Sequence, residues 1–534
     1  MAPATPRPAR SFNKESALGI GDTRLPATPL PAGDMPLPGL AGRIAPKTLG
    51  GVLGFALAYG LVHSLARLGA SRNLGEREPI ENIYAQTLAG GYSPEQLPLY
   101  DWLVWSLQQI LGPGIVSFLV LKYSLLLALA GFMFLVARRV TGSPAWGFVA
   151  VEAMALVYQI FWRLHETHTH LIGALVLSLA ALWAVMRCVD RQRWGDYAML
   201  AVIVGLGSLT QLTFPLFMLA LACACLWQPA VRQRLFTRKL LAALPLTLLC
   251  IAPYIFWLMQ APGRLDDFVA SMPPPAWAET GAPPLIALWE SIQTPLLALS
   301  PYLLFLFLIF PRVFSALFAH CREPGADPAA PDWTRVITYT VLLEWGVFVI
   351  VSVAYGLQRY SVQDLLVFFL IAIVALTDGA RRSLPPEKAK QRYMRLAVLI
   401  SVIALLVRLA HMYIHEPICK TCRWGEPYAA LADSLRADGF RGGNIVTNDA
   451  ALGGNLRAHF PSSRIILSPQ AELPASCTAR TCILTNPGKA RTDAPAGAHV
   501  VEVNVPWKHL WKPTGYRTST WWYEFPPPAG EQAQ

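Results

Sequence analysis

Long apolar stretches constrain this chain more than any other feature of its sequence. A helix needs about 20 mainly apolar residues to cross the roughly 30 Å hydrocarbon core of a bilayer. With 54% hydrophobic and 14% charged residues, the chain departs from the composition of soluble globular proteins. We therefore expect a polytopic α-helical membrane protein with about eleven spanning helices. The apolar stretches lie near residues 49–69, 114–137, 146–162, 170–187, 196–212, 214–229, 240–259, 294–314, 336–355, 363–378 and 395–414. The junction around Phe214-Pro215 fits either a tight hairpin or a kink.

The distribution of Lys and Arg predicts the orientation of these helices. Basic clusters occur at residues 138–139, 187–193, 231–239 and 380–395, all in connections of the same parity. Cytoplasmic loops of membrane proteins carry such an excess of positive charge. We therefore expect a cytoplasmic N-terminus and a C-terminus on the opposite, periplasmic side. The net charge of +11 reflects this asymmetry, and we do not expect nucleic-acid binding.

Three regions of different composition are expected. Residues 1–46 are polar and rich in Pro and Ala, which predicts a disordered cytoplasmic tail rather than a cleavable signal peptide. Residues 47–414 form the predicted membrane domain, with outer loops at about 70–113 and 260–293. In residues 415–534, "GNIVTND", "SRIILSP", "CILTNP" and "HVVEVNVP" are predicted strands with helical patterns before or between them. This alternation predicts a small α/β domain outside the membrane.

Four cysteines lie in this outer region, namely Cys419, Cys422, Cys477 and Cys482. An even number of cysteines in an oxidising compartment favours disulfides. Zinc is the alternative, because "CKTC" is a plausible pair of ligands, although no His reinforces it.

The first outer loop combines broken helical patterns with aromatic residues and acids. "ENIYAQTLAGG" fits a helix ended by Gly, and "LPLYDWLVWSLQQIL" fits a helix opened by Pro. Such helices can lie in the membrane interface as simple anchors. Glu76, Glu78 and Glu81 follow the first predicted span by only a few residues, and each fits a solvated charge on its own. A carboxylate beside a membrane cavity can instead act as a general base.

The order of these motifs resembles the polytopic glycosyltransferases of the C-type fold that use polyprenyl-phosphate sugars. It is similar to the bacterial protein-mannosyltransferase-like and aminoarabinose-transferase-like families, including rhizobial galacturonosyltransferases. "THT" at 167–169 and "GGNLRAHFPSSRI" in the outer domain add to the likeness. The matching residues of the first loop are Ala85, Gln86, Leu88, Gly91, Tyr92, Pro98, Leu99, Tyr100, Trp102 and Leu103.

The resemblance implies an enzyme of a bacterial inner membrane. It implies a C-type first periplasmic loop and an inverting transfer of a sugar from polyprenyl phosphate. The acceptor would be lipid A or core oligosaccharide, another envelope glycan, or a protein. No cofactor is required beyond the lipid donor, and membrane lipids are further partners.

The resemblance also suggests site residues. The family's first acid would be Glu78, followed as candidates by Glu81 and Glu76, although the leading Asp of the family is absent. Leu97 replaces the first Pro of the family's Pro-Pro pair. The donor phosphate or sugar would contact Arg359, Arg163, His168, Tyr100 and Gln96 on the outer side, the last of which stands where some relatives carry Lys. Lys122 is a further candidate, because it is an ionisable residue within a predicted span. The three cations can alternatively extend to lipid headgroups.

"HETHTH" at 165–170 also contains metal-ligand residue types. The zinc-protease pattern fails because Thr169 stands in place of its second His. We expect no metal site, and a divalent ion bound by His165, Glu166, His168 and His170 is the alternative.

Two other classes of protein fit a chain with many spans. A lipid or glycan transporter tends to carry internal repeats and interrupted helices at the midplane, and we find no convincing repeat. A catalytically inactive envelope assembly factor is compatible with the missing Asp.

Overall fold

The computed structural model describes residues 47–94, 96–166, 169–270, 281–323, 329–357, 366–383, 387–419, 423–468, 482–488, 494–495, 497–510 and 515–526. Its helices are α2 (Leu49–Ala70), α3 (Glu78–Tyr84), α4 (Leu99–Leu111), α5 (Ile115–Thr141), α6 (Pro144–Met154), the π-helix η1 (Gln159–Arg163), α7 (Leu164–Glu166), α8 (Thr169–Arg191), α9 (Trp194–Gly207), α10 (Thr213–Trp227), α11 (Pro229–Leu235), α12 (Arg238–Met259), α13 (Arg264–Ala270), α14 (Pro284–Ala298), α15 (Ser300–Ile309), α16 (Val313–Arg322), α17 (Trp333–Tyr355), α18 (Leu366–Arg382), α19 (Glu387–Ile418), α20 (Tyr428–Ala437) and α21 (Ala450–His459).

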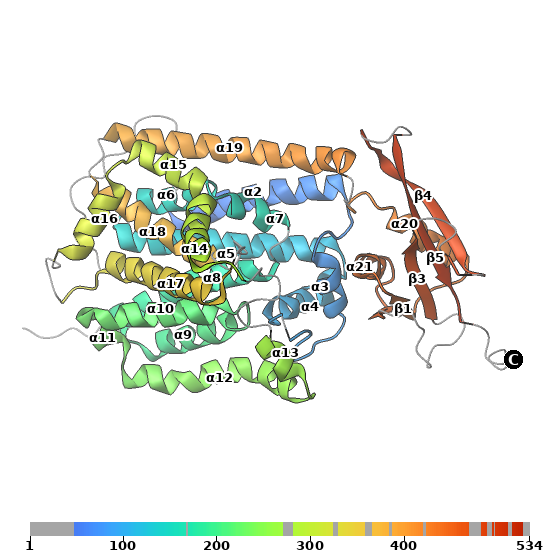
Figure 1. Cartoon of the computed structure of the whole chain (residues 1–534), viewed down its shortest axis with the longest axis horizontal. Helices are drawn as coiled ribbons and strands as arrows, with labels where there is room; N and C mark the ends of the chain where they lie inside the picture. The colour runs from blue at the N-terminus through green and yellow to red at the C-terminus, as the bar shows by residue number, and fades with distance from the viewer. Residues whose placement is uncertain are drawn as a thin grey trace, which may run out of the picture. The chain divides into compact units, whose positions relative to one another are not determined.

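The predicted membrane domain is a bundle of helices (Figure 1). Every apolar stretch falls on a helix or on a bent pair of helices, because backbone groups in lipid must be satisfied within the segment. Within the described part of the chain, six helices are long and apolar enough to cross a membrane, or up to nine if each bent pair is one span. The prediction of a polytopic helical membrane protein is confirmed, although the expected number of about eleven spans exceeds the six to nine found in the described residues.

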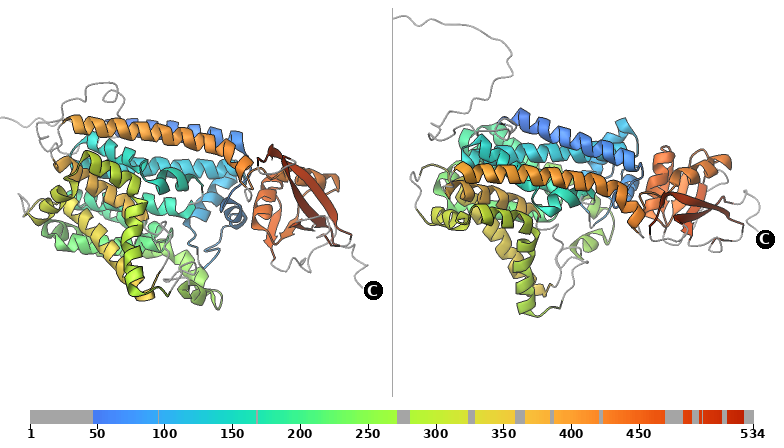
Figure 2. Two further views of the ribbon diagram at one scale, coloured as in Figure 1. Left: turned by 45° about the horizontal axis from the view of Figure 1, so that its top comes forward. Right: turned by 90° about the horizontal axis from the view of Figure 1, so that it is seen from above.

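The helices differ in how deeply they lie within the bundle. In the most apolar part of α8, 78% of the residues are buried, compared with 17% in α2 and 6% in α12. Helix α8 is therefore central, and α5 packs against both α8 and α2. The long helix α19 runs beside α2, where the Tyr413 hydroxyl donates to the Ala66 carbonyl at 3.2 Å (Figure 2).

The junction around Phe214-Pro215 separates two helices. Helix α9 ends at Gly207 and α10 begins at Thr213. A Cβ on Gly207 would lie 2.1 Å from the Phe214 ring, so only glycine fits at this close contact. A short connection between two helices, rather than a kink in one, is what the structure shows.

The outer region contains a five-stranded mixed sheet with order β2-β1-β3-β5-β4. Strands β2, β1 and β3 are parallel, whereas β5 runs antiparallel to both β3 and β4. The four predicted strands are observed, and β5 had not been predicted. The strands are β1 (Asn444–Thr447), β2 (Arg464–Leu467), β3 (Cys482–Gly488), β4 (His499–Lys508) and β5 (Tyr516–Glu524).

A separate core holds this α/β unit together. Leu431 and Leu435 of α20 pack with Leu452 and Leu456 of α21 and with the buried face of the sheet. Cys419 and Cys482 are each disulfide-bonded. Cys422 and Cys477 lie outside the described residues.

The first outer loop folds into α3 and α4. Helix α4 lies where the sequence predicted the second helix, whereas the first predicted helix, residues 81–91, was wrong in its bounds: α3 begins at Glu78 and ends at Tyr84, before the two glycines. Helix α3 contacts both α4 and α21, so it lies between the bundle and the outer α/β unit (Figure 1). Both acids of its first turn, Glu78 and Glu81, are buried. Helix α3 is therefore a packed element rather than an interfacial anchor.

Candidate active site

Glu78 forms a closed ion pair at the start of α3. Its Oε1 accepts a hydrogen bond from Lys122 Nζ at 3.0 Å, and its Oε2 accepts one from the Gly75 amide at 3.1 Å. Lys122, in α5, also donates to the His165 carbonyl at 3.3 Å. The Glu78 and Lys122 side chains are 6% and 3% exposed, so each neutralises the other away from water.

Glu81 lies one turn further along α3, and only one of its two carboxylate oxygens has a hydrogen-bond partner among the described residues. Its Oε1 accepts a hydrogen bond from the Thr169 hydroxyl and lies 3.5 Å from His170 Nε2. Its Oε2 is buried and has no hydrogen-bond partner among the described residues. The first residues of α8, Thr169 and His170, therefore fix this carboxylate from one side only.

His170 connects Glu81 to α4. Its Nδ1 lies 3.1 Å from the Leu97 carbonyl and must donate to it, and its Nε2 lies beside the Gln96 amide and 3.8 Å from Asp101 Oδ2. The Tyr100 ring lies 5.1 Å from the His170 ring.

Several buried polar atoms beside His170 have no hydrogen-bond partner among the described residues. Across the described ranges, the Tyr100 hydroxyl and both Asp101 carboxylate oxygens are buried without a hydrogen-bond partner. We call Glu81, Tyr100, Asp101, Thr169 and His170 the acid–histidine cluster.

The electrostatics of this cluster favour proton transfer near neutral pH. Burial raises the pKa of Asp101 to about 7; His170 opposes this shift and Glu81 adds to it. Burial, with the nearby Glu81 as a further cause, also raises the pKa of Tyr100 well above its usual value, so its hydroxyl stays protonated. The cluster thus combines a carboxyl that titrates near pH 7 with a hydroxyl donor.

The predicted cations and the third acid are dispersed. Arg163 is 39% exposed and lies 3.6 Å from Glu166, which is also paired with the buried Arg408. Glu76 is exposed, with a left-handed backbone φ of 53°. His168 and Arg359 lie outside the described residues.

Comparison with known proteins gives this geometry a context. Residues 93–257 match the family described as dolichyl-phosphate-mannose-protein mannosyltransferase. The crystal structure of ArnT from Cupriavidus metallidurans bound to undecaprenyl phosphate superposes with a TM-score of 0.58 at 12% identity, covering 89% of this chain and 98% of that one. The chain is a membrane glycosyltransferase of the C-type fold.

Two curated relatives support this assignment. The lipopolysaccharide core galacturonosyltransferases RgtA and RgtB of Rhizobium johnstonii are each 23% identical to the glycosyltransferase. The RgtA match covers 80% of this chain and 84% of the relative, and the RgtB match covers 80% and 86%. The similarity therefore extends over most of both chains.

The "HETHTH" motif of the glycosyltransferase is divided among different contacts. The His165 ring nitrogens lie 3.1 and 3.2 Å from the Tyr59 and Tyr123 hydroxyls, and its ring stacks on His63. Glu166 forms an ion pair with Arg408, and His170 belongs to the acid–histidine cluster. In the described residues, no group of three or more His, Cys, Asp or Glu side chains is placed to hold a metal ion.

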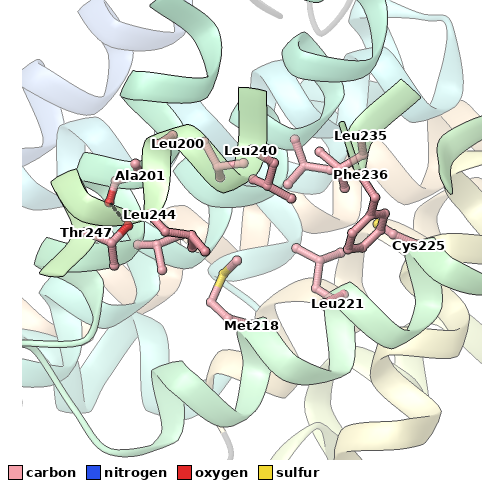
Figure 3. A pocket seen from close by; sticks show the side chains of 14 residues that line it. Leu200, Ala201, Met218, Leu221, Cys225, Leu235, Phe236, Leu240, Leu244 and Thr247 are labelled. Atoms are coloured by element: carbon pink, nitrogen blue, oxygen red, sulfur yellow. Dashed lines mark hydrogen bonds between the residues drawn. The ribbon is translucent and has the colours of Figure 1, made fainter. Parts of the chain in front are cut away.

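A separate cavity of the glycosyltransferase lies between α9, α10 and α12 (Figure 3). Apolar side chains such as Leu200, Met218, Leu221 and Leu244 line it. The Thr247 hydroxyl donates a hydrogen bond to the Ala201 carbonyl at 2.9 Å. This apolar lining suits a hydrocarbon chain, and among the described residues it has no charged side chain that would bind a sugar or a phosphate.

Sequence reasoning missed three kinds of contact in the site. Asp101 is not among the predicted site residues, although an acid directly after Tyr100 at the start of a helix is a visible signal. His170 is predicted only as an alternative metal ligand. Arg457 approaches α3 from a segment 375 residues away in the sequence, and no local pattern indicates such a contact.

Proposed function

We propose that this glycosyltransferase moves a sugar from a polyprenyl phosphate to a hydroxyl of an envelope glycan at the outer face of a bacterial inner membrane. The observation that carries the proposal is the open Oε2 of Glu81 within the buried acid–histidine cluster. The undecaprenyl phosphate in the ArnT structure supports the lipid donor. The names of the two rhizobial relatives support a uronic acid as the sugar and the lipopolysaccharide core as the acceptor.

The reaction needs one base and a leaving group that departs as an anion. The acceptor oxygen forms a bond to the anomeric carbon while the bond from that carbon to the phosphate oxygen breaks, and the phosphate leaves with the electron pair. The transition state is oxocarbenium-like, as in glycoside hydrolysis, and attack opposite the phosphate inverts the anomeric centre. The acceptor proton passes to Glu81 Oε2.

Glu81 suits the role of base better than Glu78. Both oxygens of Glu78 already accept hydrogen bonds, from Lys122 and from the Gly75 amide. Glu81 has one oxygen anchored by Thr169 and the other open, which orients a carboxylate without blocking it. His170 and Asp101 can then share the proton before it returns to water.

The donor phosphate requires positive charge or hydrogen-bond donors. Lys122 is engaged with Glu78, so we assign it to holding α3 rather than to the phosphate. Arg163, Arg359 and His168 remain our candidates for the phosphate, and Tyr100 and Gln96 our candidates for the sugar. A protein, lipid A or another envelope glycan is the alternative acceptor.

Glu81→Gln tests this proposal directly. Loss of a positioned general base costs about 10²–10⁴-fold in rate, so transfer in membranes supplied with polyprenyl-phosphate sugar and lipopolysaccharide acceptor should fall by that factor. The amount of folded protein should stay normal, because the amide still accepts from Thr169. Glu502→Gln, a matched change at an exposed acid of β4, should leave the rate unchanged. A wild-type rate in Glu81→Gln would place the base elsewhere.

A further inference from the structure

The outer α/β unit is hydrogen-bonded to α3 and to the residues on either side of it, through both backbone and side-chain groups. Asn82 Nδ2 donates to the Gly454 carbonyl at 2.8 Å, and the Leu74 amide donates to Asn455 Oδ1 at 2.8 Å. Gln86 pairs with the backbone of Ile465 in both directions, at 3.2 and 2.6 Å. The helix that carries Glu81 is therefore held by the outer unit at Asn82 and through the segments before and after it.

Arg457 of α21 donates several of the hydrogen bonds in this contact. Its guanidinium donates to the Asn82 carbonyl, to Asn82 Oδ1 at 3.0 Å, to Gln108 Oε1 at 2.7 Å and to the Ala85 carbonyl at 3.2 Å. The residue is 6% exposed. Burial lowers its pKa to about 10.

All four of these acceptors are neutral, and in the described residues no carboxylate bonds to Arg457. Burying a cation without a counter-ion is costly unless hydrogen bonds compensate it. The contact therefore fixes geometry at an energetic cost instead of neutralising a charge.

The backbones of α21 and α3 also touch. A Cβ on Gly454 would lie 2.3 Å from the Pro79 carbonyl oxygen and 2.5 Å from Pro79 Cα. Backbone atoms cannot move aside as a flexible side chain can, so glycine is required for this approach. Pro79 follows Glu78 directly and precedes Glu81 by two residues, which ties the position of α21 to that of both acids.

We propose that Arg457 is a positioning residue for sugar transfer, and that the outer domain acts through α21 to hold α3 so that Glu81 keeps its place in the acid–histidine cluster. This inference rests on the function proposed above. Asn82 is the residue next to Glu81, and Arg457 holds both its carbonyl and its side chain. The active site thus has two parts, of which the carboxyl-terminal domain supplies the support and the bundle supplies the chemistry.

The test uses Arg457→Met in the full-length, detergent-solubilised protein. Amide hydrogen exchange in residues 78–86 should become at least about tenfold faster, and kcat should fall by about 10²-fold with KM little changed, because a displacement of about 1 Å at a catalytic group has that effect. Arg457→Lys, which keeps the charge and some of the donors, should recover part of kcat. Arg441→Met, at an exposed arginine of the same domain, is the matched control and should change neither quantity.

Gly454→Ala gives an independent reading if Arg457→Met folds poorly. Its Cβ must push α3 away, so the same exchange and kcat changes are expected, whereas Gly54→Ala on α2, where a Cβ meets nothing within 4 Å, should be neutral. Unchanged exchange in residues 78–86, or unchanged kcat in both Arg457→Met and Gly454→Ala, would overturn the positioning role. If the wild-type protein transfers no sugar from a polyprenyl-phosphate donor, the proposed function fails, while the exchange experiment still decides the grip on α3.

Discussion

At the scale of single residues, the structure separates two acids that the sequence could not distinguish. Glu78 and Glu81 lie three positions apart on one short helix and are both buried. The difference is made by residues distant in sequence, namely Lys122 beside Glu78 and Thr169 beside Glu81. The sequence identified both acids as candidates but not their place on one helix, and their roles depend on tertiary partners that no local motif reveals.

Breaking the buried Glu78–Lys122 pair from one side should destabilise the protein strongly. Removing one partner of a buried ion pair leaves an uncompensated charge and costs about 3–5 kcal/mol. Lys122→Met should therefore lower the melting temperature of the purified protein in detergent. The double variant Glu78→Gln/Lys122→Met should recover much of the loss, because no unpaired charge is left. Additive losses in the double-mutant cycle would contradict the coupling.

Asp101 should make stability depend on pH. Its pKa is raised to about 7 in the folded protein, compared with about 3.9 for an unperturbed Asp. The folded state then binds the proton more tightly, so the contribution of Asp101 is fully present below about pH 4 and is lost as pH rises through about 7. Relative to Asp101→Asn, the wild type should lose stability between these values. Parallel denaturation curves for the two proteins at pH 5 and pH 8 would refute this.

At the scale of secondary-structure elements, hydrophobic patterning predicted the helices of the bundle more completely than the strands of the sheet. Each apolar stretch became a helix because lipid-facing backbone must pair within its own segment. The sequence of β5 alternates only partly, with Trp521, Trp522 and Tyr523 all buried in a row, so it lacks the period-two signal of a half-exposed strand. The Pro boundary of α4 was visible in the sequence, whereas α3 ends at Tyr84 instead of at the predicted glycines, and its burial under α21 depends on a contact with a remote segment.

At the scale of the whole molecule, the distribution of basic residues predicts a topology that a fusion experiment can check. We expect the connection at 231–239 in the cytoplasm and the domain after about 415 in the periplasm, because cytoplasmic loops are enriched in Lys and Arg. Alkaline phosphatase fused after residue 440 should be active, and fused at residue 235 inactive, at equal fusion-protein levels. The opposite pattern would move the acid–histidine cluster to the cytoplasmic side.

The distance in sequence between Asn82 and Arg457 has a consequence for biosynthesis. The two residues are 375 positions apart, so at about 5–20 residues per second a ribosome needs roughly 20–75 s to add the second after the first. Until then α3 has emerged without its support. A nascent or prematurely terminated chain can insert its helices yet lacks the grip on Glu81. If Arg457 positions Glu81 as proposed, catalytic competence is acquired only after α21 has been made, and a chain that terminates before α21 has no transfer activity.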